Sequence, residues 1–225
     1  DKGEKFSQSS FDEVLKNNVA SVVKKQLDVG IDFVSDGEMS KISYATYIKD
    51  RIDGFSGESE RRAPADLDDF PEYKEKIAKS GGTPTYTRPC CTNELKVKDE
   101  TSLLQDINNF KNSLDKLNHR HAFMNSASPG VINVFMPNKF YSTEDEYLDK
   151  LSNIMAKEYE LITKSDIQVQ LDCPDLALAR HMNFKNLSED EFIKRAELQI
   201  ECLNSALSNV NVEQTRMHIC WGNYE

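Results

Sequence analysis

The sequence lacks the features that mark membrane-spanning and secreted proteins. None of its apolar runs approaches the roughly 20 residues that a helix needs to cross a bilayer. Its first residues form no apolar signal region. The five cysteines are odd in number and contain no Cys-x-x-Cys motif, which favours reduced thiols over a disulfide framework. We therefore expect a cytoplasmic location.

Positive charge is also scarce. The chain has 28 Lys and Arg against 38 Asp and Glu, a formal net charge of −10. Nucleic acids and anionic membrane surfaces reward clustered Lys and Arg, so we expect neither as a partner. No G-x-G-x-x-G or G-x-x-x-x-G-K-[ST] motif follows a predicted strand, which removes support for a nucleotide-binding open sheet.

What the sequence does have is a regular alternation of helical and strand patterns. Capping-box spacings and a glycine at the expected helix end, Gly30, mark the helix boundaries. This alternation is typical of parallel strands joined by right-handed crossovers, so the candidate architectures are a βα barrel and an open doubly wound sheet. The predicted helices cover residues 11–29, 101–117, 143–164 and 188–208, and the predicted strands cover residues 31–35, 121–126, 167–172 and the C-terminal end.

The alternation stops between about residues 53 and 98. This stretch is rich in glycine, proline and charge, and we interpret it as an excursion from the main fold. A solvated surface insertion is favoured there over a binding role. Residues 86–91 and 94–97 are predicted to form a hairpin at the end of it.

A histidine and a cysteine, His218 and Cys220, lie two residues apart on the last predicted strand. Side chains at this spacing share one face of a strand, with Met217, Ile219 and Trp221 on the other. A neutral imidazole and a thiolate are half of a tetrahedral zinc site. By itself the spacing is weak evidence, because a packed histidine beside a buried cysteine is the more common arrangement.

Polar residues gather where the predicted strands end. Glu38 follows the first strand, and Asp172 closes the strand over residues 167–172. In a βα barrel the carboxyl ends of all strands meet at one mouth, so residues far apart in sequence come together there. Taken singly, each acid would be a helix cap or an ion-pair partner. Taken together with His218 and Cys220, they favour a functional site.

Four motifs resemble the catalytic domain of cobalamin-independent methionine synthase and, more closely, its shorter single-domain relatives. The match runs from about Phe11 to the end of the chain, and its motifs are residues 30–38, 128–132, 171–177 and 217–225. The resemblance implies an α/β fold, a (β/α)8 TIM barrel that is incomplete at both ends in this chain. Residues 1–225 would then be one partial catalytic domain of a longer protein, with the excursion at about 53–98.

The same resemblance implies roles for the four candidate residues. His218 and Cys220 match the first two zinc ligands of the family, and a later glutamate and cysteine would lie beyond residue 225. Glu38 and Asp172 match the acids that hold the amino group of an amino-acid thiol. Residues 172–175 are Asp-Cys-Pro-Asp, the form of the shorter relatives, where full-length synthases have Asp-Glu-Pro-Ala.

The activity that the resemblance implies is zinc-dependent methyl transfer in methionine biosynthesis. A folate-type donor such as methyltetrahydrofolate would methylate a thiol, homocysteine in the first instance, held as a zinc thiolate. Alternatives are an alkyl transferase acting on another thiol such as coenzyme M, a metal-free relative such as uroporphyrinogen decarboxylase, and a non-catalytic barrel that serves as a binding or assembly partner. The partners expected are therefore small molecules, and a homo-oligomer is left open.

Overall fold

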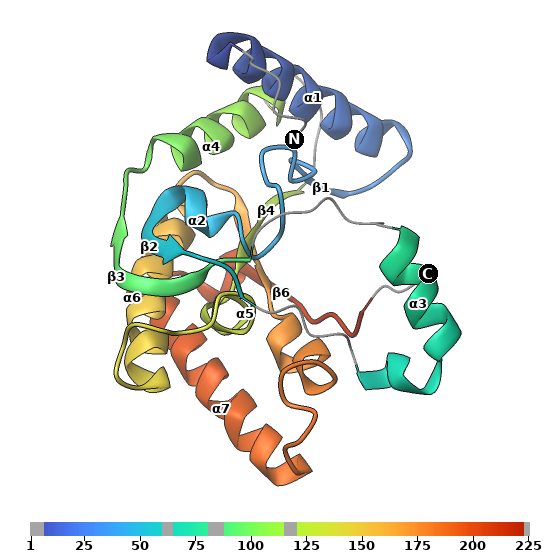
Figure 1. Ribbon diagram of the computed structural model, residues 1–225. Coiled ribbons are helices and arrows are strands. Elements are labelled where there is room, and N and C mark those ends of the chain that lie inside the picture. The colour runs from blue at the N-terminus through green and yellow to red at the C-terminus, as the bar shows by residue number, and fades with distance from the viewer. Residues whose placement is uncertain (1–6, 60–64, 81–87, 115–120, 223–225) are drawn as a thin grey trace.

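The computed structural model describes residues 7–59, 65–80, 88–114 and 121–222. Helices and strands alternate along most of this length (Figure 1). The helices are α1 Gln8–Asp28, α2 Ile48–Arg51, α3 Pro71–Ser80, α4 Thr101–Leu114, α5 Pro129–Phe135, α6 Glu144–Thr163 and α7 Glu189–Ala206. The strands are β1 Phe33–Ser35, β2 Ile52–Ser56, β3 Cys90–Val97, β4 His121–Ala127, β5 Gln168–Asp172 and β6 Thr215–His218, and the short 3-10 helices are Ala65–Asp69, Pro174–Leu176, Leu178–Arg180 and Val212–Gln214.

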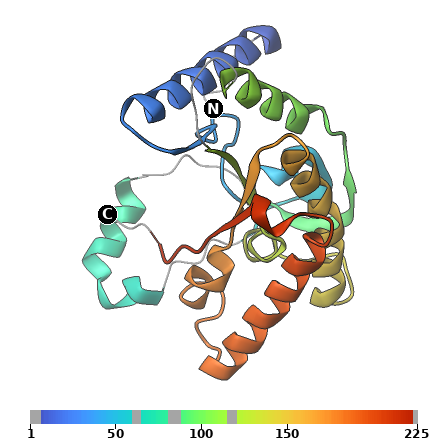
Figure 2. The same cartoon turned by 180° about the vertical axis from the view of Figure 1, so that it is seen from behind.

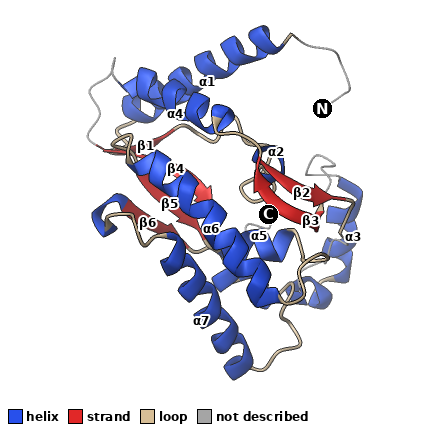
Figure 3. Ribbon diagram, turned by 90° about the vertical axis from the view of Figure 1, so that its left-hand side faces the viewer, coloured by secondary structure: helices blue, strands red, loops and turns tan. Residues whose placement is uncertain are grey.

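The main sheet has four strands in the order β1-β4-β5-β6. All three pairings are parallel, which confirms the sequence prediction of parallel strands joined by crossovers. Helices α6 and α7 lie together on one side of these strands (Figure 3). Within the described residues β1 and β6 are the two edges of the sheet, so the sheet does not close into a barrel there.

The two faces of β5 differ in polarity. Val169 and Leu171 are buried on the helix-covered face, whereas Gln168 and Gln170 are only partly buried on the other. Helix α6 meets the apolar face with a stripe of buried side chains that includes Met155 and other members of the core. Each such aliphatic side chain contributes about 1.5–3 kcal/mol on burial. The polar face of the strand is therefore left available for a site.

The predicted helix boundaries are confirmed within a few residues because the capping residues act as expected. Ser188 and Glu191 form a reciprocal capping box at the start of α7. At the start of α6 the Thr143 hydroxyl accepts from the main-chain N–H of Glu146 at 3.1 Å. Gly30 follows the end of α1 with φ of 85°, a conformation that glycine adopts without strain.

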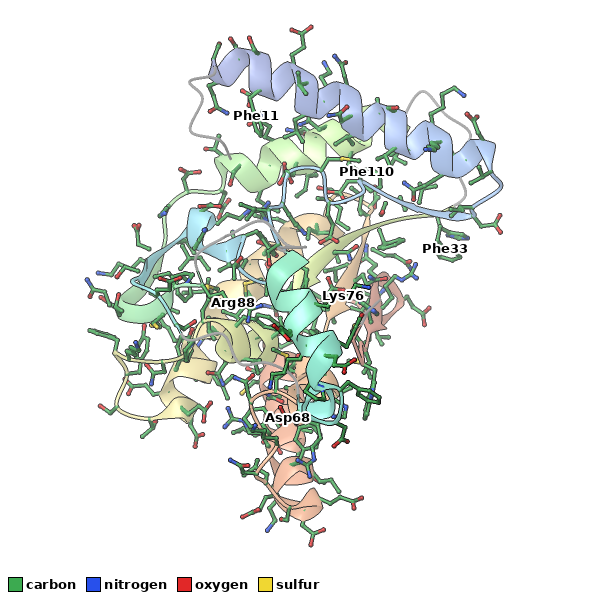
Figure 4. The ribbon with its side chains drawn as sticks, turned by 45° about the vertical axis from the view of Figure 1, so that its right-hand side comes forward. Phe11, Phe33, Asp68, Lys76, Arg88 and Phe110 are labelled. Atoms are coloured by element: carbon green, nitrogen blue, oxygen red, sulfur yellow. The ribbon has the colours of Figure 1, made fainter. Side chains whose placement is uncertain are left out.

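Helices α1 and α4 pack side by side at one end of the sheet, as both views show (Figures 1 and 2). Phe110 of α4 is fully buried and lies on the side facing α1 (Figure 4). Phe11 of α1 and Phe33 of β1 remain 45% and 41% exposed. Among the described residues, no helix is long and apolar enough to cross a membrane.

The predicted hairpin of residues 86–91 and 94–97 is wrong. Cys90–Val97 is one continuous strand, β3, and it pairs antiparallel with β2 at the start of the same excursion. Residues 86 and 87 lie outside the described ranges. Strand β2 was not predicted because its central residue, Gly54, is typical of loops. Gly54 lies at an irregularity in the pairing with φ of 106°, and an added Cβ would lie 2.8 Å from the carbonyl oxygen of Glu94.

Candidate functional site

Glu38 lies in a tight turn directly after β1. Asp36 Oδ1 accepts from the main-chain N–H of Glu38 at 3.0 Å, and Gly37 and Glu38 both have positive φ, 69° and 52°. An added Cβ on Gly37 would come within 3.0 Å of Val22 Cγ1, so α1 packs closely against the turn. The left-handed conformation is costly for glutamate and is held by this packing and hydrogen bonding. The turn thereby fixes Glu38 at the carboxyl end of β1.

Asn125, Asp172 and His218 form a hydrogen-bonded row across the carboxyl ends of β4, β5 and β6. Asn125 Nδ2 donates to Asp172 Oδ2 at 3.2 Å, and Asp172 Oδ1 lies 3.2 Å from His218 Nδ1. The strand register places Asp172 directly beside His218. Asp172 is 3% exposed, so these contacts replace its hydration. The structure thus brings together two of the residues that the sequence had singled out.

Glu38 faces the same region as this row. Burial raises the pKa of its carboxyl group, the charge of Lys41 opposes that rise, and the charges of Asp172 and Asp36 add to it. Glu38 Oε1 is buried, and it accepts no hydrogen bond from the described residues. Leaving a buried acceptor without a donor costs about 1–3 kcal/mol. A ligand with a hydrogen-bond donor, and above all a cationic one, would remove that cost.

The contact between His218 and Asp172 selects one form of the imidazole. A carboxylate only accepts, so Nδ1 carries a proton, and Nε2 of the neutral ring keeps its lone pair. The His218 side chain is 51% exposed, which leaves it accessible to a ligand. A carboxylate behind a histidine is the usual support of a metal-ligating imidazole.

The expectation that His218 and Cys220 share a strand is wrong in one respect. Strand β6 ends at His218, and the carbonyl oxygen of Cys220 instead accepts from the main-chain N–H of Leu178 at 3.1 Å. After His218 the chain no longer pairs with β5, and it lies beside the segment that follows β5. Cys220 is partly buried and its thiol is free. Its apolar neighbours Ile219 and Trp221 are 55% and 63% exposed.

His218 and Cys220 fit zinc in kind but not in number. An imidazole and a thiolate are the donors that zinc prefers, and they make up half of a tetrahedral set. Across residues 7–59, 65–80, 88–114 and 121–222, no group of three or more His, Cys, Asp and Glu side chains could hold a metal ion. Any complete site therefore needs donors beyond that part of the chain.

A second buried acid, Asp175, supports the loop beneath the row. It is 2% exposed and accepts from the Ser128 hydroxyl at 2.9 Å, while that hydroxyl caps α5 by accepting from Val131 N–H. Gly130 is required here, because an added Cβ would lie 2.1 Å from Asp175 Oδ2. Burial raises the pKa of Asp175 to about 6, against the opposing hydrogen bond from Ser128. The acid ties the β4–α5 turn to the end of β5.

This raised pKa predicts how stability depends on pH. A carboxyl group whose pKa is higher in the folded state contributes stability that is present below its unfolded pKa and is lost as pH rises through about 6. Replacing Asp175 with asparagine should therefore stabilise the protein relative to wild type by about 2–2.5 kcal/mol more at pH 7 than at pH 4. Denaturant unfolding at both pH values measures this difference. The exposed Asp50→Asn variant is the control, and an equal effect of Asp175→Asn at both pH values contradicts the prediction.

Sequence reasoning missed Asn125 and Lys41. Asn125 lies inside a strand that was predicted, and its position two residues after Phe123 puts both side chains on the same face of β4. That alternation was a usable signal. Lys41 follows Glu38 by three residues, but its main partner, the carbonyl oxygen of Asn125, is 84 residues away. No local pattern announces a contact of that kind.

The fold and the site together define an α/β protein with parallel strands and a polar site at their carboxyl ends. Within that class, the chain is similar to curated proteins named methionine synthase. It is 24% identical over 221 residues to that of Sulfolobus acidocaldarius, 23% over 221 residues to that of Thermococcus kodakarensis, and 23% over 222 residues to that of Pyrococcus furiosus. Each alignment covers 98% of this chain and 55% of the relative, so the chain spans about half the length of these relatives. No family model matches.

Two solved structures share the fold. The B12-independent methionine synthase of Shewanella sp. W3-18-1 superposes with a TM-score of 0.70 and 17% identity, covering 97% of this chain and 55% of that one. A candidate B12-independent methionine synthase of Listeria monocytogenes superposes with a TM-score of 0.67 and 14% identity, covering 100% of this chain and 60% of that one. The resemblance predicted from the four motifs is thereby confirmed.

Proposed function

We propose that this chain forms part of a zinc-dependent methyltransferase that moves a methyl group from a folate-type donor to the thiol of homocysteine. The observation that carries the proposal is the row of strand-end residues in which Asp172 supports His218, with the partly buried Glu38 near it. The relatives are named methionine synthase, which supports methionine formation as the reaction. We further propose that the four parallel strands belong to an eight-stranded βα barrel, since in that architecture the carboxyl ends of strands form the active site.

His218 and Cys220 would hold the zinc ion. Bound zinc supplies a positive charge that keeps a substrate thiol ionised at neutral pH, where a free thiol with a pKa near 8.5 is mostly protonated. Asp172 fixes the imidazole so that Nε2 points its lone pair away from the carboxylate. The remaining ligands would be a glutamate and a cysteine outside residues 1–225.

Glu38 and Asp172 would bind the ammonium group of the amino-acid thiol. Glu38 Oε1 is a buried acceptor that lacks a donor among the described residues, and an ammonium group has three donors. Asp172 already accepts from Asn125 on Oδ2 and from His218 and Gln170 on Oδ1, so the ammonium group would use the remaining lone pair of Oδ2. Two carboxylates beside one ammonium also favour amino-acid thiols over simple thiols.

The experiment that tests this proposal compares two thiols. Homocysteine and 4-mercaptobutyrate both carry a thiol and a carboxylate, but only homocysteine has an amino group. We expect the zinc-loaded protein to prefer homocysteine, and Glu38→Gln to weaken homocysteine about 10–100-fold, the scale of a charge-assisted hydrogen bond, with little change for 4-mercaptobutyrate. Isothermal titration calorimetry measures both affinities.

The exposed Glu201→Gln variant serves as the control and should bind both thiols as wild type does. Equal affinity of the wild-type protein for the two thiols would remove the ammonium site from the proposal. Formation of methionine from homocysteine and methyltetrahydrofolate by the whole protein then tests the reaction itself.

A further inference from the structure

Lys41 is a buried cation that the proposed chemistry does not use. Its side chain is only 3% exposed although lysine is normally hydrated, and its ammonium group donates to the main-chain carbonyl oxygen of Asn125. The same Nζ lies 4.0 Å from Glu38 Oε1 and 4.5 Å from the centre of the Tyr47 ring. Asn125 in turn donates to Asp172 through its side chain. Lys41 therefore lies beside Glu38 and is linked to Asp172 through Asn125.

We propose that Lys41 is a positioning residue whose ammonium group, anchored on the Asn125 carbonyl, holds the Glu38 carboxylate charged and in place for the substrate. The inference rests on the proposed role of Glu38 as a site for an amino group. At 4.0 Å the two groups attract each other without a direct hydrogen bond, so Glu38 Oε1 keeps its lone pairs for a ligand. A closer lysine would occupy the very oxygen that the ligand needs.

The charges around Glu38 explain why a cation is needed there. Among the described residues, the charges that act most strongly on Glu38 are those of Lys41 and Asp36 close to it in the chain, Asp172 on β5 and His218 on β6. Two of these are acids, and burial also disfavours the charged carboxylate. Lys41 is the strongest influence in the opposite direction. Without it, the pKa of Glu38 would rise further, and the protonated form has no charge to attract an ammonium group.

The buried side of Lys41 explains how it is held. Beyond Tyr47 lies a cluster in which Arg51 bridges Asp106 and Glu158, and the negative charge of Glu158 also acts on Lys41. The ring of Tyr47 contacts both cations, at 4.5 Å from Lys41 Nζ and 4.8 Å from the guanidinium carbon of Arg51. Lys41 is thus fixed on three sides, and its charge acts on Glu38 from a defined position.

The test is the titration of the Glu38 carboxyl group, followed by carbon NMR in ligand-free protein labelled at glutamate and assigned with Glu38→Gln. We expect Lys41→Gln, which removes the charge but keeps an N–H donor on a shorter side chain, to raise the midpoint of the Glu38 titration by about one pH unit. Lys41→Arg should raise the midpoint by less than half as much, because it keeps the positive charge. Lys164→Gln, which removes an exposed lysine paired with Glu160, should leave the midpoint unchanged.

A Glu38 midpoint that is the same in wild type, Lys41→Gln and Lys41→Met overturns the proposal. The methionine variant is included because it keeps the packing of the stem if the glutamine variant folds poorly. Homocysteine affinity forms the second part, measured at the wild-type midpoint of the Glu38 titration and two pH units above it: Lys41→Gln should lose about fivefold at the midpoint and very little at the higher pH, because a one-unit shift removes most of the charged form only near or below the midpoint. If Glu38 shifts as expected but wild type does not bind homocysteine, the proposed function fails while the role of Lys41 stands.

Discussion

Replacing Arg51 with methionine is expected to lower the free energy of unfolding by about 3–5 kcal/mol. The guanidinium group lies 2.6 Å from Asp106 Oδ2 and 2.9 Å from Glu158 Oε2, and all three side chains are 10% exposed or less. Glu158 also accepts from the hydroxyl groups of Tyr47 and Ser126. Removing the cation would leave two buried carboxylates without their ion-pair partner, which is far more costly than losing a surface pair.

Urea unfolding followed by circular dichroism measures this effect. Two further variants serve as a control and as a test of its cause. Lys24→Met removes a cation from an exposed pair with Asp28 and should cost less than about 1 kcal/mol. Adding Asp106→Asn and Glu158→Gln to Arg51→Met should recover part of the loss, since the unpaired charges are then gone. A loss below about 1 kcal/mol for Arg51→Met would mean that the cluster is solvated or rearranged.

This cluster also shows where sequence reasoning stops. The three residues of the cluster come from three helices. Arg51 is 55 residues from Asp106 in the sequence and 107 residues from Glu158. Each of them looks like an ordinary surface charge in its own helical pattern. Only the packing of α2, α4 and α6 turns them into a buried group. The same is true of Lys41, whose partner on β4 no local spacing predicts.

The features that could be predicted from the sequence depend on interactions between near neighbours in the chain or on the regular geometry of parallel strands. Ser188 with Glu191 announced the start of α7, because a capping box satisfies free N–H groups within four residues. Asp172 and His218 could be placed together because parallel strands present their carboxyl ends at one edge. The same reasoning wrongly extended the last strand to Cys220. The strand ends before it, and a contact with Leu178 decides its position instead.

Loss of the Cys220 thiolate should have the largest effect on the proposed metal site. We expect Cys220→Ser to weaken zinc binding at least about 100-fold, because an alcohol is a poor ligand beside a thiolate. His218→Ala should do the same by removing the imidazole. Asp172→Asn keeps both ligands but gives His218 a weaker acceptor, so a smaller loss of about 10–100-fold is expected. The three variants thus separate ligands from their support.

Competition with a chromophoric chelator measures these affinities, and elemental analysis gives the zinc content of the purified protein. Cys202→Ser is the matched control, since it removes another free and partly buried thiol that lies on α7, and it should leave zinc binding unchanged. Stoichiometric zinc retained by both Cys220→Ser and His218→Ala would end the proposal of a His218–Cys220 site. Equal loss in Cys202→Ser would show that the effect reflects damage to the fold, because the thiol of Cys202 belongs to a different element from His218 and Cys220.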